Sequence, residues 1–274
     1  HIPIDTLNKL EMDYKEFARQ RRIDMLKMTH RAQSSHIGSN FSCIDILSVL
    51  YNIADLSLLP DGRTKDVVIV KAWAAASVYA CLVAKGLLPQ EAVDDYGKEG
   101  TKWVTVLDPL PPYIPFETGA MGYHLPAAVG FALAKKIKKE EGIVYCLTSD
   151  GELNIGSTWE SLAIAKQHKL DNLIIVVDQN SLQAMGATKD ILDMEPLDEK
   201  LKAFGWSVTK IDGHNFEQIE NAVNGKDKKE FRRLSQAPEA IIAKTIKGKG
   251  WKRAENNNLF HYSHVNEEML KEAL

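Results

Sequence analysis

The chain has 274 residues, of which 45% are hydrophobic and 26% are charged, so it can bury a large core as one α/β domain or two small ones. Its 34 Lys and Arg and 37 Asp and Glu residues are interspersed and leave a net charge of −3, which argues against a nucleic acid or a membrane surface as a partner. Three cysteines in apolar segments, no apolar stretch long enough to span a bilayer and no charged-then-apolar leader lead us to expect a cytoplasmic protein with reduced thiols.

The first part of the chain is expected to be helical. Apolar residues recur near helical spacing in residues 5–33, which predicts an outer pair of helices. A polar segment with His36 follows, and Ser42 with Asp45 three positions later has the spacing of a capping box, which predicts a helix that begins at Ser42. The histidine is either an ordinary loop residue or a hydrogen-bonding group at a ligand site.

A strand, two helices and a long loop are expected next. The β-branched run 66–70 predicts a short strand, and the Ala-rich segment after it predicts a helix that stops near Gly86. Residues 100–118 are rich in Pro and lack periodicity, which indicates a loop of the kind that usually has a function. From Leu125 onward, small and apolar residues recur at helical spacing, which is typical of a helix packed on a sheet.

The centre of the chain has the pattern of a βαβ unit. The apolar runs 143–147 and 173–177 are too short for helices and predict buried parallel strands, and residues 157–168 between them have helix-forming composition. The first strand leads into Asp150 and the second into Asn180. Because ligands of open parallel sheets bind beyond the carboxyl ends of the strands, we expect these two polar loops to form the site.

Oxygen-bearing groups in these loops suit a hard cation. The Asp150 carboxylate, the Asn180 side-chain carbonyl and the Leu182 backbone carbonyl supply three oxygen ligands and leave room for a diphosphate and water around Mg²⁺. Gly151 lets the backbone approach a phosphate without a Cβ in the way. The alternative is that Asp150 and Asn180 are ordinary turn residues.

The last third of the chain continues the α/β pattern. Residues 215–224 predict a helix, and residues 239–244 predict the last strand. The charged run 226–233 is expected to be a solvated face.

Several segments together resemble transketolases. Asp150-Gly151 with Asn180 placed 30 positions after the aspartate resembles the thiamin diphosphate fingerprint, apart from Ser149 in place of its first Gly. The other segments fall in the transketolase order and extend the similarity over residues 20–265; they are Ser-x-His-x-Gly at 34–38 before Asp-Ile-Leu at 45–47, the Thr-Gly segment 118–125, Thr-x-Lys-Gly-x-Gly at 245–250 and Phe260-His261. The resemblance implies an α/β fold, with a parallel β-sheet flanked by helices, of the thiamin diphosphate-binding type that holds the diphosphate, and residues 1–274 as a single domain.

The resemblance also implies roles for individual residues. Thiamin diphosphate and Mg²⁺, or Ca²⁺ or Mn²⁺ in its place, are the implied cofactors, with the metal on Asp150, Asn180 and Leu182. His36 and His261 are the implied catalytic residues, although a lone His at 261 could also be a surface residue. The implied cofactor-binding residues are Trp73, Gly119, Met121, Asp150, Gly151, Glu152, Asn180 and His261.

The chain departs from the transketolase pattern near the expected pocket. Trp73 stands where transketolases have a His, and Tyr123 and His124 stand where they have Gln-Gly. Trp73 either packs the core or faces the site, and in the second case the donor pocket is expected to be smaller and less polar. Ile155 stands where transketolases have a Glu of a carboxylate chain that links two active sites, of which Glu160 remains.

The implied activity needs a second chain. In transketolases the Glu that activates the cofactor lies in a pyrimidine-binding domain that follows the segments found here. We therefore expect the diphosphate-binding subunit of a split transketolase, in an α2β2 assembly with a subunit that carries the pyrimidine-binding and C-terminal domains. The expected reaction is transfer of a two-carbon ketol unit from a ketose or ketose phosphate to an aldose. The alternatives are a related thiamin-dependent lyase or decarboxylase acting on a 2-oxo acid or unusual donor, and a non-catalytic regulatory subunit.

Overall fold

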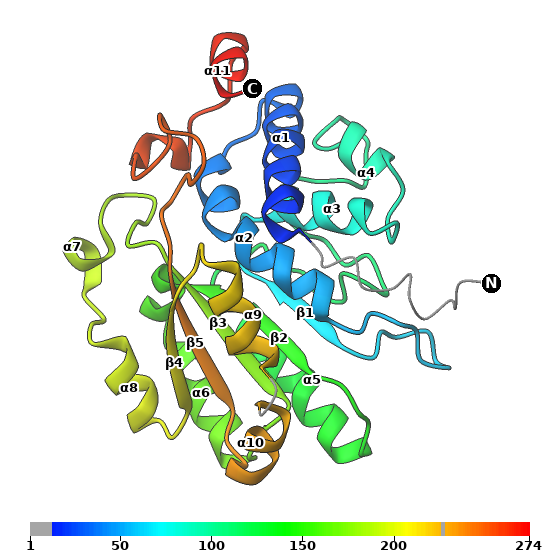
Figure 1. Cartoon of the computed structure of the whole chain (residues 1–274), viewed down its shortest axis with the longest axis vertical. Helices are drawn as coiled ribbons and strands as arrows, with labels where there is room; N and C mark the ends of the chain where they lie inside the picture. The colour runs from blue at the N-terminus through cyan, green and yellow to red at the C-terminus, as the bar shows by residue number, and fades with distance from the viewer. Residues whose placement is uncertain (1–12, 226–227) are drawn as a thin grey trace.

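A five-stranded parallel sheet forms the centre of the computed structural model, which describes residues 13–225 and 228–274. The strands lie in the order β1-β2-β3-β5-β4, with helices on both faces (Figure 1). Every neighbouring pair is parallel, which confirms the predicted fold class. The strands are β1 (Val67–Val70), β2 (Val144–Ser149), β3 (Leu173–Gln179), β4 (Ser207–Asp212) and β5 (Glu239–Lys244).

The apolar runs form strands because both of their faces are buried. In β3, Ile174 and Val176 pack into the core on one side of the sheet, and Ile175 and Val177 pack into the core on the other side. The first core is completed by α1 (Tyr14–Ala32), α2 (Ile37–Ile53), α3 (Ala75–Ala84) and α9 (Phe216–Asn224). The second is completed by α5 (His124–Lys138), α6 (Gly156–Gln167) and α8 (Leu197–Ala203).

The shorter elements lie in the connections and near the C-terminus. They are α4 (Glu91–Asp94), η2 (Asp150–Asn154), α7 (Thr188–Leu192), α10 (Lys228–Ser235), η3 (Asn258–His261) and α11 (Glu267–Ala273). Two of them, η2 and η3, lie close to the carboxyl ends of the strands and therefore matter for the site.

Two expectations for the N-terminal helices are wrong. Where a pair of helices was expected in residues 5–33, the described part of that range forms the single helix α1, and the residues before 13 lie outside the described part. Helix α2 begins at Ile37 and not at Ser42. Ser42 lies inside the helix, where its hydroxyl donates to the carboxylate of Asp178 and lies 2.9 Å from the Ser39 carbonyl oxygen, so it is a buried donor and not a cap.

The charged run near residue 230 is only partly a solvated face. Arg233 is exposed, but Arg232 is buried and its guanidinium lies 3.2 Å from a carboxylate oxygen of Glu239, which is fully buried at the start of β5. Lys228 donates to the same carboxylate. The composition of the run does not reveal this pairing, because Glu239 lies outside the run and is buried only once β5 joins the sheet, where a buried carboxylate requires paired cations. Residues 226 and 227 of the run lie outside the described part.

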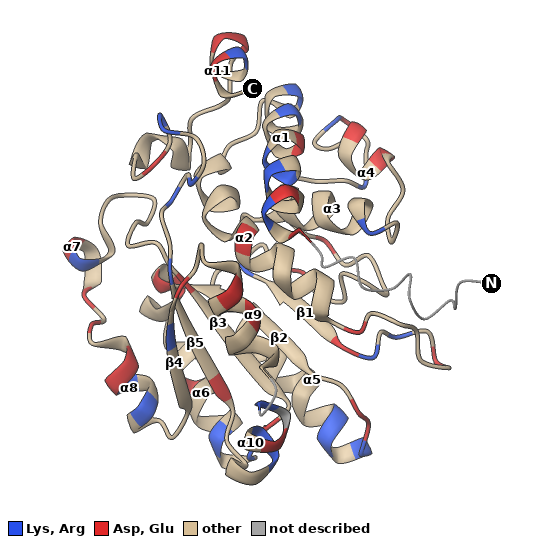
Figure 2. Ribbon diagram, in the orientation of Figure 1, with Lys and Arg blue, Asp and Glu red and all other residues tan. Residues whose placement is uncertain are grey.

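Charged side chains gather on the outer helices, whereas the strands are mostly uncharged (Figure 2). The three cysteines are free and buried. Within residues 13–225 and 228–274, no helix combines the length and apolarity that crossing a membrane requires.

Candidate functional site

A cavity of about 470 Å³ opens at the carboxyl edge of the sheet. It brings together most of the residues that the sequence predicts for the site: His36, Trp73, Gly119, Met121, Gly151, Glu152, Asn180, Leu182 and His261. Asp150 lies behind this cavity and faces a neighbouring one that Ser181 and Thr188 also line. The two loops that follow β2 and β3 therefore meet where the strand pattern predicts.

Asp150 is a buried carboxylate held by neutral donors. It accepts the backbone N–H of Ser181 at 2.7 Å and of Gly151 at 2.9 Å, and the Thr188 hydroxyl lies 3.4 Å away. Burial and the nearby charge of Asp178 raise the pKa of Asp150 to about 6. A bound cation at this carboxylate would offset both effects, because it supplies the opposite charge that hydrogen bonds alone do not.

Asn180 and Leu182 complete the oxygen set on the next loop. The Asn180 side-chain oxygen accepts the Leu182 backbone N–H at 3.1 Å, and its amide nitrogen lies 3.3 Å from a carboxylate oxygen of Asp178. The described residues contain no group of three His, Cys, Asp or Glu placed to hold a metal ion. One carboxylate, one amide and one carbonyl are nevertheless the hard oxygen donors that Mg²⁺ accepts when phosphate and water fill the other positions, so the residues fit this group.

Glu152 holds the turn after β2. Its carboxylate accepts the backbone N–H of Ser149 and the hydroxyl of Thr148, both at 3.1 Å, as the carboxylate of a capping box does. Its other oxygen lies 3.0 Å from His124 Nδ1. Although burial opposes ionisation, His124 and Lys71 hold the pKa of Glu152 below its usual range. Glu152 therefore fixes the segment that carries Asp150, and it also lines the cavity.

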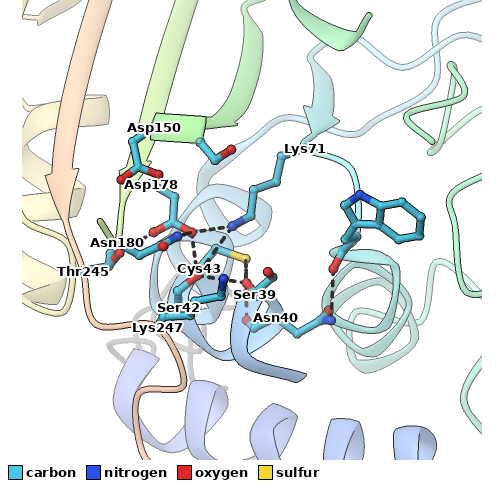
Figure 3. Close-up of polar contacts among 12 residues, drawn as sticks. Ser39, Asn40, Ser42, Cys43, Lys71, Asp150, Asp178, Asn180, Thr245 and Lys247 are labelled. Atoms are coloured by element: carbon cyan, nitrogen blue, oxygen red, sulfur yellow. Dashed lines mark hydrogen bonds and ion pairs between the residues drawn. The ribbon is translucent and has the colours of Figure 1, made fainter. Parts of the chain in front are cut away.

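A buried ion pair below the loops was not predicted from the sequence. Lys71, at the end of β1, donates to Asp178 in β3, and both side chains are almost completely buried. Ser42, Thr245 and Asn180 also lie within hydrogen-bond distance of the Asp178 carboxylate (Figure 3). We call Asp178 with these four partners the Asp178 network. It joins α2, β1, β3 and the end of β5 beneath the candidate metal ligands.

Lys247 was also missed, although its loop was recognised. It is 1% exposed, and its ammonium donates to His261 Nδ1 at 2.8 Å and to the backbone carbonyls of Leu182 and Gln183 at 3.3 Å. Burial lowers the pKa of Lys247 to about 8. Burial and the Lys247 charge lower the pKa of His261 to about 3, so this histidine is neutral near pH 7.

His36 and Trp73 form one wall of the cavity. Their rings stack with centroids 4.3 Å apart and an interplanar angle of 14°, so Trp73 faces the site and does not pack the core. Both backbones are left-handed, with φ of 72° for His36 and 67° for Trp73, which is rare for such side chains and marks a constrained position. Asn40 ties them together, because its amide donates to both backbone carbonyls. Burial and the Lys247 charge lower the pKa of His36 to about 4.

The other departures lie away from the cavity. Tyr123 is 63% exposed, and His124 is buried against Glu152, so neither adds a ring beside Trp73. Ile155 packs against Gly122, whose positive φ and close neighbours leave no room for a side chain. Glu160 is exposed on α6.

The sequence matches a known family over nearly its whole length. The family described as transketolase, thiamine diphosphate binding domain, matches residues 14–273. One of the subunits of the apulose-4-phosphate transketolase of Actinobacillus succinogenes is 35% identical over 270 residues, which cover 92% of this chain and 90% of that protein. A 6-deoxy-6-sulfo-D-fructose transketolase subunit from a Clostridium species is 34% identical over 247 residues, which cover 87% of this chain and 86% of that protein.

The fold is also that of a solved transketolase. The crystal structure of transketolase from Campylobacter jejuni superposes with a TM-score of 0.82 and 28% sequence identity over 95% of this chain. The match spans 42% of the Campylobacter chain, so the present chain corresponds to less than half of that protein.

Proposed function

Because the chain belongs to the transketolase family, in its thiamine diphosphate-binding domain, we propose that it is the diphosphate-binding subunit of a split, Mg²⁺-dependent transketolase. The proposed reaction moves a two-carbon ketol unit from a ketose or ketose phosphate to an aldose, in the cytoplasm. Asp150, Asn180 and Leu182 would hold the metal, which would supply positive charge for the diphosphate of the cofactor.

The meeting of two oxygen-bearing loops at the carboxyl edge of the sheet carries this proposal. Asp150 is a buried carboxylate with a pKa raised to about 6, and the Ser181 N–H that it accepts joins it to the loop of Asn180 and Leu182. Gly151 lines the cavity, and a Cβ there would lie 3.3 Å from the Gln183 side chain. A small residue at this point keeps the backbone accessible to a phosphate group.

When bound, thiamine diphosphate would supply the carbon nucleophile and the electron sink that ketol transfer needs. The chain's own residues bind and orient the reactants. His36 and His261 are neutral near pH 7, so each ring can both donate and accept a hydrogen bond, and we assign them to substrate hydroxyl groups. The Trp73 ring, stacked on His36, excludes water from that wall.

We propose that a partner subunit covers the mouth of the cavity. Met121, Met185 and Tyr262 line the cavity and are 40%, 83% and 62% exposed. Large exposed apolar side chains around a pocket are typical of a surface that another protein covers. Two of the relatives bear names that describe them as subunits, which supports a partner with the pyrimidine-binding and C-terminal domains in an α2β2 assembly, and residues 1–274 as one domain.

The donor is proposed to differ from the usual ketose phosphates. Trp73 occupies space where transketolases carry a smaller, more polar His, and its stacking on His36 leaves that histidine one face fewer for substrate. The relatives act on apulose 4-phosphate and on 6-deoxy-6-sulfo-D-fructose, as their names state, which supports a sugar donor outside the common set.

Reconstitution with the partner subunit tests the function. The chain is mixed with a candidate subunit that carries a pyrimidine-binding domain, thiamine diphosphate and Mg²⁺, and product formation is followed with ketose phosphates, other ketoses and 2-oxo acids as donors. We expect turnover only from the mixture, with a sugar donor and an aldose acceptor. Turnover of 2-oxo acids alone would assign the protein to the lyases or decarboxylases, and cofactor binding without turnover by any partner would favour a regulatory subunit.

A further inference from the structure

The ammonium of Lys247 lies on the loop that carries the candidate metal ligands. It donates to the carbonyl of Leu182, which is one of those ligands, and to the next carbonyl, Gln183. The aliphatic part of the side chain is held in place, because a Cβ on Gly38 at the start of α2 would lie 3.3 Å from Lys247 Cγ. The ammonium is therefore a fixed positive charge at the position where a divalent cation would be an alternative partner for Leu182.

The two buried lysines of the site differ in how their charges are balanced. Lys71 is paired with the carboxylate of Asp178, and Asp178 keeps a pKa below its usual range although burial opposes its ionisation. The hydrogen-bond partners of Lys247 in the described chain are two backbone carbonyls and a histidine nitrogen. Carbonyl dipoles stabilise an ammonium less well than a carboxylate does, and the nearby carboxylates of Asp150 and Asp178 make no hydrogen bond to Lys247. The positive charge of Lys247 is therefore less fully balanced than that of Lys71, beside the cavity that Lys247 lines.

We infer that Lys247 is a resident cation of this loop, which competes with the divalent metal for the Leu182 carbonyl and gives way when an anion enters with the metal. The inference rests on the proposed metal site. Two cations on one carbonyl repel each other strongly at the effective dielectric of a buried site. A diphosphate removes this conflict, because the ammonium can then donate to phosphate oxygens.

The consequence is a coupling between the two ligands. A metal ion that binds alone is repelled by the Lys247 ammonium or must displace it, so it binds weakly. A metal ion that binds with diphosphate gains an ion pair between the diphosphate and Lys247. The substitution Lys247→Met removes the charge and keeps the length of the buried side chain. It should raise the affinity for metal alone and lower the affinity for metal with diphosphate, whereas a simple loss of packing would not change the two affinities in opposite directions.

Manganese binding measures this coupling without turnover. Free Mn²⁺ is titrated into the full chain and followed by electron paramagnetic resonance, and a preformed complex of Mn²⁺ with inorganic pyrophosphate is titrated by calorimetry. For K247M we expect Mn²⁺ alone to bind at least about fivefold more tightly than to the wild type, from the removed repulsion. We expect the Mn²⁺–pyrophosphate complex to bind at least about tenfold more weakly, from the lost charge-assisted hydrogen bonds.

Three variants serve as controls. Lys247→Arg keeps the charge and should not bind Mn²⁺ alone more tightly than the wild type. Lys249→Met removes a charge from the same loop, where the Lys249 side chain is partly exposed and lies 3.8 Å from Glu255, and should change neither affinity. Lys247→Gln, also uncharged, replaces the Met variant if that variant does not show the wild-type circular dichroism.

The outcomes separate the inference from the metal site itself. If Asp150→Asn abolishes Mn²⁺ binding but K247M binds Mn²⁺ alone no more tightly than the wild type, the competition is wrong and the metal site stands. If Mn²⁺ binds neither alone nor as its pyrophosphate complex, or if Asp150→Asn binds it as well as the wild type does, the proposed metal site and the competition are both wrong. Opposite shifts of the two affinities in K247M, with K247R and K249M close to the wild type, establish the coupling.

Discussion

The Asp178 network and the cavity differ in how their buried charged groups are paired. In the network, each charge has a partner from this chain: Lys71 pairs with Asp178, and hydroxyl groups occupy the remaining carboxylate lone pairs. In the cavity wall, the buried Lys247 has neutral hydrogen-bond partners, and at the mouth Met185 and Tyr262 are exposed. The network is thus complete in the described chain, whereas the cavity has a lysine without a paired carboxylate and an apolar rim that ligands and a partner subunit would cover.

The largest expected effect comes from removing the cation of the network. The substitution Lys71→Met leaves Asp178 buried without its counter-charge, which should lower the free energy of unfolding by about 3–5 kcal/mol. Lys247→Met is the matched variant in the cavity wall and should lower it by a smaller amount, about 1–2 kcal/mol, because hydrogen bonds are lost but no buried carboxylate loses its partner. Urea denaturation measures both. Equal losses in the two variants would show that the two regions do not differ in this way.

The clamp that holds the Lys247 loop gives the next largest effect. The Asp45 carboxylate pairs with Arg22 and accepts a hydrogen bond from His214 at 2.8 Å. Both of these partners also contact the backbone of the loop. His214 Nε2 accepts the Ile246 N–H at 2.8 Å, and Arg22 donates to the Lys249 carbonyl. Replacing His214 by Ala removes one of these two hydrogen bonds to the loop backbone. We expect binding of thiamine diphosphate with Mg²⁺ to weaken about tenfold, as for other residues that orient ligands indirectly.

Hydrogen exchange of residues 245–250 reports on the clamp directly. Exchange there should be faster in His214→Ala, while the strands exchange as in the wild type. His168→Ala changes an exposed histidine and serves as the control. An unchanged exchange rate in the loop together with unchanged cofactor affinity would mean that the loop is held without His214.

A smaller effect is expected at the wall formed by Trp73. The substitution Trp73→His restores the side chain found in transketolases and should raise kcat/KM for xylulose 5-phosphate, relative to the native donor, by about fivefold, since one pocket contact changes discrimination by roughly 1–3 kcal/mol. The assay uses the reconstituted two-chain enzyme. A wild type that already uses xylulose 5-phosphate as well as any other donor contradicts the proposed role of Trp73.

The smallest expected effect is on the pH dependence of stability. The pKa of His36 is lowered to about 4, below the unfolded value of roughly 6.5. Its contribution to stability is therefore present above about pH 6.5 and is lost as the pH falls toward 4, because the unfolded chain binds the proton more tightly. The variant His36→Asn, whose side chain tolerates the left-handed backbone, should show a shallower decline.

Thermal unfolding between pH 7 and 4.5 measures this decline. The drop in Tm should be smaller in His36→Asn than in the wild type by about 2 °C. Parallel curves for the two proteins would mean that His36 is not held neutral by its surroundings. His261 also has a lowered pKa, so the variant should retain part of the wild-type slope.

The strands and the candidate metal loops were predictable because their signals are local. A short apolar run that ends at Asp150 or Asn180 indicates both the strand and the loop after it. Partners far apart in the sequence were not predictable. Nothing near Lys71 or Lys247 distinguishes a lysine paired with a carboxylate from one that faces a cavity, because the difference arises only when β1, β3 and the 245–250 loop come together.

The errors have the same origin. Ser42 and Asp45 have capping-box spacing, yet both are used inside the fold, Ser42 by Asp178 and Asp45 by Arg22 and His214. His124 is one of the departures from the family pattern near the expected pocket, yet its ring lies against the buried carboxylate of Glu152 and not beside Trp73. In each case the side chain pairs with a buried charged group, which requires a partner, and does not take the role that the local sequence predicts.

Calorimetry measures whether the loops of Asp150 and Asn180 bind the cofactor. Thiamine diphosphate with Mg²⁺ is titrated into the chain combined with its partner subunit, using the wild type and the Asp150→Asn variant. We expect the wild type to bind and the variant to bind at least about a hundredfold more weakly, since a charged metal ligand is lost. Equal affinity of the two proteins, or no heat with the wild type, would contradict the account.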